Sequence, residues 1–324
     1  METIVAIVIL GSLILYALLG GADFGGGIWD LLAFGPRADR QRQTIAGAVA
    51  PVWEANHVWL ILVIVVLFTA FPKAFAAMMI ALHVPVTLML FGIVLRGSAF
   101  AFRKNPGERP WGRIFGAASA FTPFFQGLIL GSLTTGQIRI ENGHVVSGYF
   151  AAWVGLFAIA CGFFALTLFA FLAATYLTVD ARADAEVQND FRARALWSQF
   201  LLGVLAAIVF FTSKEGAPRM YAGLTDWWAP WLLTGTAACA VLACIALWRR
   251  RFYTARLAAI AQVTSILSGW CLSQFPYLIT PDLTIHNTAA PAVTLRLLIG
   301  ALAVGALILF PSLAYLFSVF KSNR

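Results

Sequence analysis

The chain has 324 residues and a net charge of +8, and 61% of its residues are hydrophobic while only 11% are charged. An ordinary soluble domain has about 25% charged residues. A soluble globule could not hide this much apolar surface in one core, whereas a helical bundle in lipid can expose it to equally apolar hydrocarbon tails. The composition therefore excludes a water-soluble globule and predicts an integral membrane protein.

Stretches that could cross a membrane recur along the whole chain, since a spanning helix needs about 20 mostly apolar residues. The first lacks basic residues at positions 1–3 and a small-residue cleavage site, so we interpret it as a retained span and not as a signal peptide. The four cysteines fall within these stretches without a CxxC pair and are expected to be buried thiols. About nine spans are expected, at residues 4–33, 45–71, 74–102, 112–135, 148–177, 196–213, 229–248, 256–280 and 293–319.

The basic residues of the connecting loops alternate strongly along the chain. The first, third, fifth and seventh loops contain 14 Lys and Arg residues and the C-terminal tail adds Lys321 and Arg324, whereas the even loops contain four. Because cytoplasmic loops are enriched in Lys and Arg, we predict that the odd loops and the C-terminus are cytoplasmic and that the N-terminus lies outside. This orientation requires an odd number of spans, and it explains the positive charge without a nucleic-acid partner.

The predicted fold is an all-α, polytopic transmembrane bundle that forms a single domain over residues 1–324. Nine spans are compatible with two four-helix bundles and one peripheral helix. In the fourth span, Gly127 lies four residues after Pro123 on one helix face, which is typical of close helix packing.

Ionisable side chains inside spans are energetically costly and therefore mark candidate functional sites. Asp23 lies in the glycine-rich segment 20–30 of the first span, on its predicted cytoplasmic half. Glu54 is ten residues after Thr44, where the second span is expected to begin, which is roughly 15 Å along a continuous helix. The two carboxylates would thus lead from the cytoplasmic surface toward the bilayer midplane, as a proton path requires. The alternative is a polar network that locks the first two spans together.

His57 follows Glu54 by three residues and shares its helix face. It is assigned to the proton path, although a structural role fits equally well. A Glu-x-x-His pair is also part of di-iron sites in helix bundles, but such sites need a second pair and further glutamates, and Glu54 is the one Glu in any expected span. Structural polar contacts are expected from the neighbouring residues Trp53, Asn56 and Trp59.

Two further ionisable residues in the third span favour structural roles. His83 precedes Pro85 and would satisfy a carbonyl that the proline leaves free. Arg96 would either extend toward the interface or pair with a carboxylate. Because no facing pair of histidines is evident, neither a haem nor a metal site is predicted in this chain.

The first two spans resemble subunit II of the cytochrome bd-type quinol oxidases. The matching segments are 21–27, with the sequence GADFGGG, and 51–60, with the sequence PVWEANHVWL. The resemblance covers essentially the whole length, with further matches at residues 119–123 with Gly127, at the loop with Arg192 and Arg194, and at residues 275–277.

The resemblance implies a non-haem subunit of a terminal oxidase in the bacterial inner membrane. The family's enzyme oxidises quinol and reduces dioxygen to water, and haems b and d belong to the larger subunit I. Subunit II packs against subunit I and lends residues to proton uptake from the cytoplasm, among them the residue matching Glu54. Some members bind a structural quinone in this subunit, and some complexes contain small single-span subunits.

Three positions depart from the common family pattern. Many members have Asp where this chain has Glu54, many have Gln where it has His57, and some have an acidic residue where it has Gly20. The chain is also short, which indicates the cyanide-insensitive oxidase-like branch.

Two other functions stay open. One is a stand-alone proton-coupled transporter, although its matching breaks in two repeats are not seen here, and the other is a haem-binding electron carrier.

Overall fold

The computed structural model describes residues 1–49, 53–102 and 109–321 of the chain. Twelve helices and two short hairpins make up this described part. The helices are α1 (Glu2–Leu31), α2 (Ala38–Val49), α3 (Trp53–Ala70), α4 (Pro72–Ala81), α5 (His83–Phe102), α6 (Arg109–Ser132), α7 (Leu156–Asp180), α8 (Ala185–Gly216), α9 (Pro218–Leu224), α10 (Ala229–Trp248), α11 (Phe252–Gln274) and α12 (Ala292–Lys321). The hairpins are β1 (Ile140–Glu141) with β2 (His144–Val145), and β3 (Tyr277–Ile279) with β4 (Leu283–Thr284), both antiparallel.

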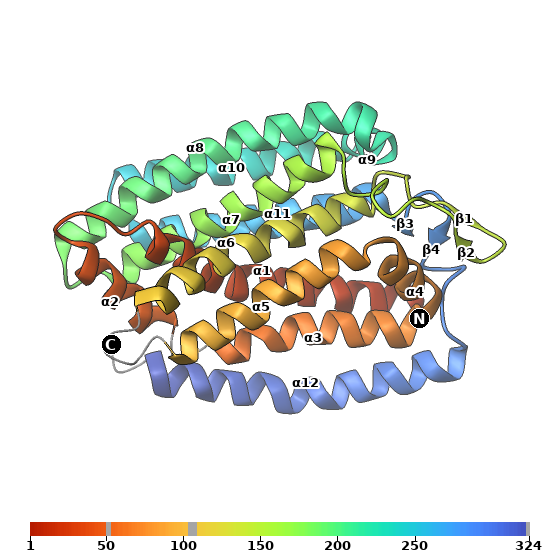
Figure 1. The fold of residues 1–324 in the computed structure, drawn as a ribbon, viewed down its shortest axis with the longest axis horizontal. Coiled ribbons are helices and arrows are strands. Elements are labelled where there is room, and N and C mark those ends of the chain that lie inside the picture. The colour runs from red at the N-terminus through yellow and green to blue at the C-terminus, as the bar shows by residue number, and fades with distance from the viewer. Residues whose placement is uncertain (50–52, 103–108, 322–324) are drawn as a thin grey trace.

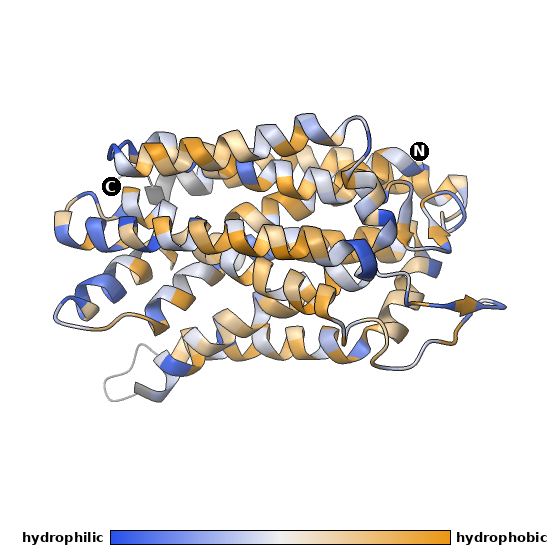
Figure 2. Ribbon diagram, turned by 90° about the horizontal axis from the view of Figure 1, so that it is seen from above, coloured by the Kyte–Doolittle hydropathy of each residue, from blue (hydrophilic) through white to orange (hydrophobic). Residues whose placement is uncertain are grey.

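The long helices run side by side along the length of the molecule, and the start of α1 and the end of α12 lie at opposite ends (Figure 1). Hydrophobic residues dominate the middle of these helices, and hydrophilic residues gather at the two ends (Figure 2). This is the arrangement that a bilayer imposes, because backbone polar groups must be satisfied within each helix while apolar side chains face the lipid. The predicted all-α transmembrane bundle is therefore confirmed.

Eight helices of the described part are long and apolar enough to cross a membrane, and a ninth span is reached if the bent pair α3 and α4 counts as one. The second expected span differs most from the structure. Its start forms the separate helix α2, whose charged residues Asp39, Arg40 and Arg42 favour the polar end of the bundle. At its other end the chain bends by 117° between α3 and α4, because Pro72 cannot continue the α3 hydrogen-bond pattern and instead begins α4.

Helix α1 lies at the centre of the bundle and packs against α3, α6, α7 and α11. Its glycines allow this close packing: a Cβ at Gly25 would overlap the backbone carbonyl of Phe169 on α7. The same holds between α6 and α7, where a Cβ at Gly127 would overlap the carbonyl of Cys161. Pro123 lies inside α6, one turn before Gly127.

Helix α12 lies at the edge of the bundle, beside α3 (Figure 1). None of the residues in its apolar window is buried within the chain. Leu297, Val304 and Leu307 are among its exposed side chains. Lipid or another protein must cover this helix in the membrane.

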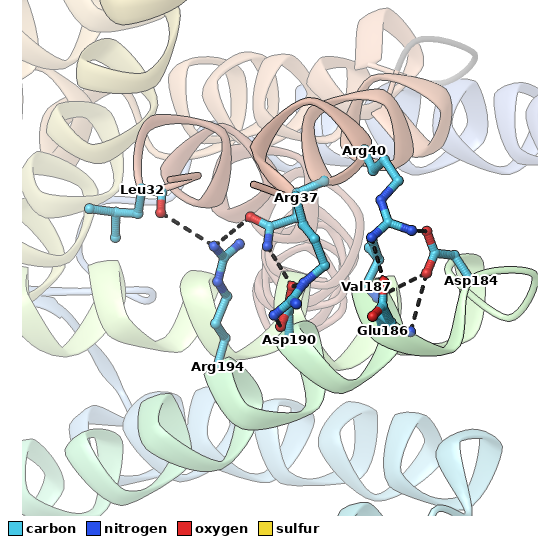
Figure 3. A network of polar contacts seen from close by, with 9 residues as sticks. Leu32, Arg37, Arg40, Asp184, Glu186, Val187, Asp190 and Arg194 are labelled. Atoms are coloured by element: carbon cyan, nitrogen blue, oxygen red, sulfur yellow. Dashed lines mark hydrogen bonds and ion pairs between the residues drawn. The ribbon is translucent and has the colours of Figure 1, made fainter. Parts of the chain in front are cut away.

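Helix α2 is fixed to α8 at the end of the bundle that carries the arginine-rich loops. Arg37 donates from Nε and Nη2 to the two carboxylate oxygens of Asp190, each at 2.8 Å, and Gln41 Nε2 donates to Asp190 Oδ2 at 2.7 Å (Figure 3). Arg194 Nη2 donates to Gln41 Oε1 at 2.8 Å. These four residues form what we call the α2–α8 clamp, in which the bidentate guanidinium–carboxylate geometry adds specificity.

Candidate functional site

A buried ion pair joins α1 to α5 near the centre of the bundle. Arg96 Nη2 lies 2.6 Å from Asp23 Oδ1, and the two side chains are 1% and 3% exposed. Arg96 Nε also donates to Ser119 Oγ on α6 at 3.1 Å. The guanidinium lies over the rings of Phe24 and Phe115, with its carbon 4.6 and 5.1 Å from their centroids. Two helices, α1 and α6, therefore supply the partners of one buried cation on α5.

This arrangement decides between the two roles that the sequence allows for Arg96. Its side chain does not extend to the interface but pairs with a carboxylate 73 positions away in the sequence. Asp23 keeps one oxygen available, because Oδ2 is buried and accepts no hydrogen bond from the described residues. Asp23 is thus a fixed carboxylate with one bonded oxygen and one oxygen open to a further donor.

A narrow pocket adjoins Asp23 and leads to the end of α7. It has a volume of about 60 Å³, which is room for a few waters, since one water needs about 10–15 Å³. Its polar lining residues are Asp23, Asn56, Tyr176, Asp180 and Arg256, and the other lining residues are apolar or glycine. Because Asp23 is buried and Asp180 is exposed, the pocket connects the buried carboxylate with the arginine-rich end of the bundle.

The walls of this pocket come from helices that are distant in sequence. On one side, the Arg256 guanidinium of α11 lies over the Tyr176 ring of α7, 4.4 Å from its centroid. On the other side, Asn56 Nδ2 of α3 donates to the Leu19 carbonyl of α1 at 3.3 Å and is buried. Tyr176 and Arg256 therefore lie between Asp23 and the arginine-rich end, whereas Asn56 contacts α1 one turn further from that end than Asp23.

His57 lies beside this site and packs on aromatic side chains of α1. Its ring centroid is 6.3 Å from that of Tyr16 and 5.9 Å from that of Phe24. The Tyr16 hydroxyl accepts a hydrogen bond from Gln126 Nε2 of α6 at 2.7 Å. His57 is thus close to the ion pair through Phe24, which contacts both His57 and Arg96.

The structure describes the side chains of some expected site residues of the second span but not of others. Glu54 and Trp53 belong to the first turn of α3, but their side chains lie outside the described residues, as does the chain at 50–52. Helix α3 is described from Trp53 onward, so the depth of Glu54 cannot be counted along a helix from Thr44. Trp59 is buried and packs against Phe310 of α12, with ring centroids 6.1 Å apart.

The described residues form no group of three His, Cys, Asp or Glu side chains that could hold a metal ion. The histidines of α3 and α5 contact different residues. His83 Nδ1 lies 2.9 Å from the Ile80 carbonyl and its ring packs on Tyr149, whereas the ring of His57 packs on Tyr16 and Phe24. The four cysteines are free thiols and partly buried.

The family model for cytochrome bd terminal oxidase subunit II matches residues 1–320. The chain belongs to this family. Known proteins of the family align with it over most of its length. It is 24% identical to the putative cytochrome bd menaquinol oxidase subunit II of Bacillus subtilis (strain 168), over 100% of this chain and 96% of that protein. It is 28% identical to the cytochrome bd-I ubiquinol oxidase subunit 2 of Escherichia coli (strain K12), over 56% of this chain and 49% of that protein.

The fold agrees with a solved member of the family. The structure of bd oxidase from Geobacillus thermodenitrificans contains a chain that matches with a TM-score of 0.82 and 26% identity, over 100% of this chain and 99% of that chain. The predicted family, fold class and role as a subunit of a quinol oxidase in the bacterial inner membrane are confirmed. A stand-alone transporter is not favoured. As subunit II, the chain implies a subunit I partner.

Proposed function

We propose that this subunit II conducts protons from the cytoplasm toward the oxygen-reducing site of its partner, through the pocket beside Asp23 and through Glu54, with His57 alongside. The observation that supports this proposal most is a single pocket lined both by exposed Asp180 and by buried Asp23, with Tyr176 and Arg256 also in its lining. The mouth of the pocket lies at the arginine-rich end of the bundle, which the loop charges predict to be cytoplasmic.

The residues along this path have different tasks in the proposal. Waters in the pocket would pass protons along hydrogen bonds, and Asp23 Oδ2, which accepts none from the described residues, would hold the innermost water. Arg96 balances the charge of Asp23, so the carboxylate can remain in the apolar bundle. Glu54 would then gain and lose the proton, because a side chain on a relay must exist in both states. His57 would line the next part of the path, beside Tyr16.

The partner subunit would hold the haems b and d and oxidise quinol, as the family resemblance implies, and this chain would support that subunit while supplying protons. Polar groups of the first two spans need a protein surface to satisfy them, so we expect α1 and α3 to face subunit I. A structural quinone in this chain stays a prediction, which extraction of the purified complex and analysis for quinone would test. Small single-span subunits stay a prediction as well.

Glu54 provides the sharpest test, because Gln has nearly its shape and hydrogen-bonds but cannot gain and lose a proton. Glu54→Gln should leave assembly and the haem spectrum unchanged while slowing oxygen consumption by roughly 10²-fold, the scale of one lost proton-transfer group. Glu54→Asp should keep much of the activity, since the resembling family accepts either acid. Glu215→Gln, at an exposed Glu on α8, is the matched control and should have no effect.

A purely structural role for Glu54 predicts a different pattern. The Gln variant would then consume oxygen at the wild-type rate, and Glu54→Ala would lower the yield of assembled complex instead. A Gln variant that assembles fully and turns over normally contradicts the proton role.

A further inference from the structure

A second pocket lies at the same end of the bundle, between the α7–α8 turn and the α10–α11 turn. Its volume is about 370 Å³, much larger than that of the pocket beside Asp23. Arginine residues from both turns line it, namely Arg182, Arg250 and Arg251. The remaining lining residues are Val179, Gln188, Phe252, Tyr253 and Thr254. We call this space the arginine pocket.

The charged residues that line the arginine pocket are all positive. None of its lining residues is a carboxylate. Two nearby acidic residues of the described chain are engaged elsewhere, since Asp184 and Glu186 accept hydrogen bonds from Arg40 (Figure 3). Three guanidiniums around one open space favour an anionic ligand, and phosphate in particular, because the planar guanidinium matches phosphate oxygens.

The backbone of the α10–α11 turn keeps an arginine where glycine would be easier to accommodate. Arg250 has a φ of +57°, in the left-handed region that ends many helices and that L side chains seldom adopt. The turn is closed by hydrogen bonds from the Arg250 N–H to the Leu247 carbonyl and from the Arg251 N–H to the Ala246 carbonyl. The sequence thus retains a guanidinium at a position that favours glycine.

The first turn of α11 adds to the attraction for an anion. Phe252, Tyr253 and Thr254 begin this 23-residue helix and also line the pocket. The first N–H groups of a helix have no partner within it, and the helix dipole places partial positive charge at the same end. The side chain of the N-cap residue Arg251 has donors only and so cannot cap these N–H groups. The arginines and the helix start therefore converge on one space.

The surroundings of the pocket indicate that the anion belongs to a lipid. Trp248 and Tyr253, on the two sides of the α10–α11 turn, are 74% and 63% exposed, and Leu257, one turn further along α11, is 67% exposed. Aromatic residues at the end of a span are typical of the membrane interface, and an exposed apolar helix face below them suits acyl chains. A soluble phosphate has no apolar part that could contact this surface.

We propose that the arginine pocket binds the phosphate of an anionic phospholipid from the leaflet on the arginine-rich side of the membrane, with the acyl chains along α10 and α11. Basic pockets between transmembrane helices on the cytoplasmic side commonly bind such head groups. The proposal is independent of proton conduction, because the arginine pocket shares no lining residue with the pocket beside Asp23.

The test uses the purified two-subunit oxidase, delipidated in detergent, with phosphatidylglycerol, phosphatidylcholine and glycerol 3-phosphate as probes and native mass spectrometry as readout. We expect phosphatidylglycerol to bind at least tenfold more tightly than either other probe. Arg250→Gly and Arg251→Gln together should weaken its binding about 25-fold, since one arginine near a lipid surface contributes about fivefold. Arg250→Gly relieves the left-handed backbone, so a loss of binding cannot be attributed to misfolding of the turn.

The matched control is Arg249→Gln, which removes a neighbouring charge of the same turn that does not line the pocket. Binding of phosphatidylglycerol to this variant should stay within about twofold of wild type. Equal binding to the double variant and to wild type would overturn the proposal. Tight binding of glycerol 3-phosphate would overturn the lipid assignment in favour of a soluble anion, and equal binding of phosphatidylcholine would show that the phosphate charge is not recognised.

Discussion

The buried pair of Asp23 and Arg96 makes a strong prediction about stability, because each charge depends on the other. The pair is nearly inaccessible to water, with side chains 3% and 1% exposed. Removing one partner of such a pair leaves an uncompensated buried charge and costs about 3–5 kcal/mol. Asp23→Asn and Arg96→Gln are each expected to lower stability by this amount.

The double variant should behave differently from the two single ones. Replacing a buried ion pair by apolar residues of similar volume is often neutral or stabilising. Asp23→Leu combined with Arg96→Met should therefore recover most of the loss. A double-mutant cycle that uses Asp23→Leu and Arg96→Met as its single variants should show a coupling of about 3 kcal/mol. The double variant should still consume oxygen slowly, because it lacks the carboxylate that we place on the proton path.

The assay is the yield and the thermal unfolding of the complete oxidase, followed by its haem absorbance, with oxygen consumption measured on the same samples. Arg37→Gln breaks an ion pair of similar geometry whose arginine is 41% exposed, and it serves as the control that should change stability little. Single variants as stable as the wild type would refute the reasoning. A stable double variant with wild-type oxygen consumption would remove Asp23 from the path while leaving the structural pair intact.

Four further predictions concern topology, haem, proton entry and the partner. A C-terminal reporter should be active in the cytoplasm, as the loop charges require, and activity on the outer side alone would contradict the predicted orientation. His57→Ala and His83→Ala should leave the haem content of the complex unchanged, because His57 packs on the Phe24 ring and His83 Nδ1 lies against the Ile80 carbonyl, so loss of one haem band would refute the non-haem assignment. Asp180→Asn should slow proton uptake at the arginine-rich face several-fold, with Asp39→Asn, which lies outside the pocket, as the unaffected control; equal rates would place the entry elsewhere. A photo-cross-linker at Ile61, an exposed residue of α3, should capture subunit I, and capture of lipid alone would contradict the expected interface.

The sequence was sufficient to predict the bundle because hydropathy and loop charge are properties of contiguous residues. It missed the separation of α2 from the second span, since the apolar residues that follow Thr44 hide the change from a polar helix to a spanning one. It also placed the third span across Leu82, where α4 ends and α5 begins. These breaks depend on how the helices bend and pack, which the hydropathy of a contiguous segment does not record.

The site was partly predictable for a similar reason. An ionisable residue in an apolar stretch is visible in the sequence, so Asp23 and Arg96 both stood out. Their pairing was not visible, because the contact joins α1 to α5 and depends on how the helices pack. Asp180 and Arg256 were missed as lining residues of the pocket because each lies at the end of a helix, where charged residues are common. Only the pocket in the structure shows that these two residues lie on a route to Asp23.

The α2–α8 clamp bears on how the protein is made. Its contacts join residues 153 and 149 positions apart, as between Arg37 and Asp190 and between Gln41 and Asp190. At about 5–20 residues per second, a ribosome needs roughly 10–30 s to synthesise the intervening chain. Throughout that interval α2 is available to other contacts at the membrane surface, while α3 to α7 are being inserted. The clamp can close only after α8 has emerged, so the end of the bundle that carries it is completed late in biogenesis.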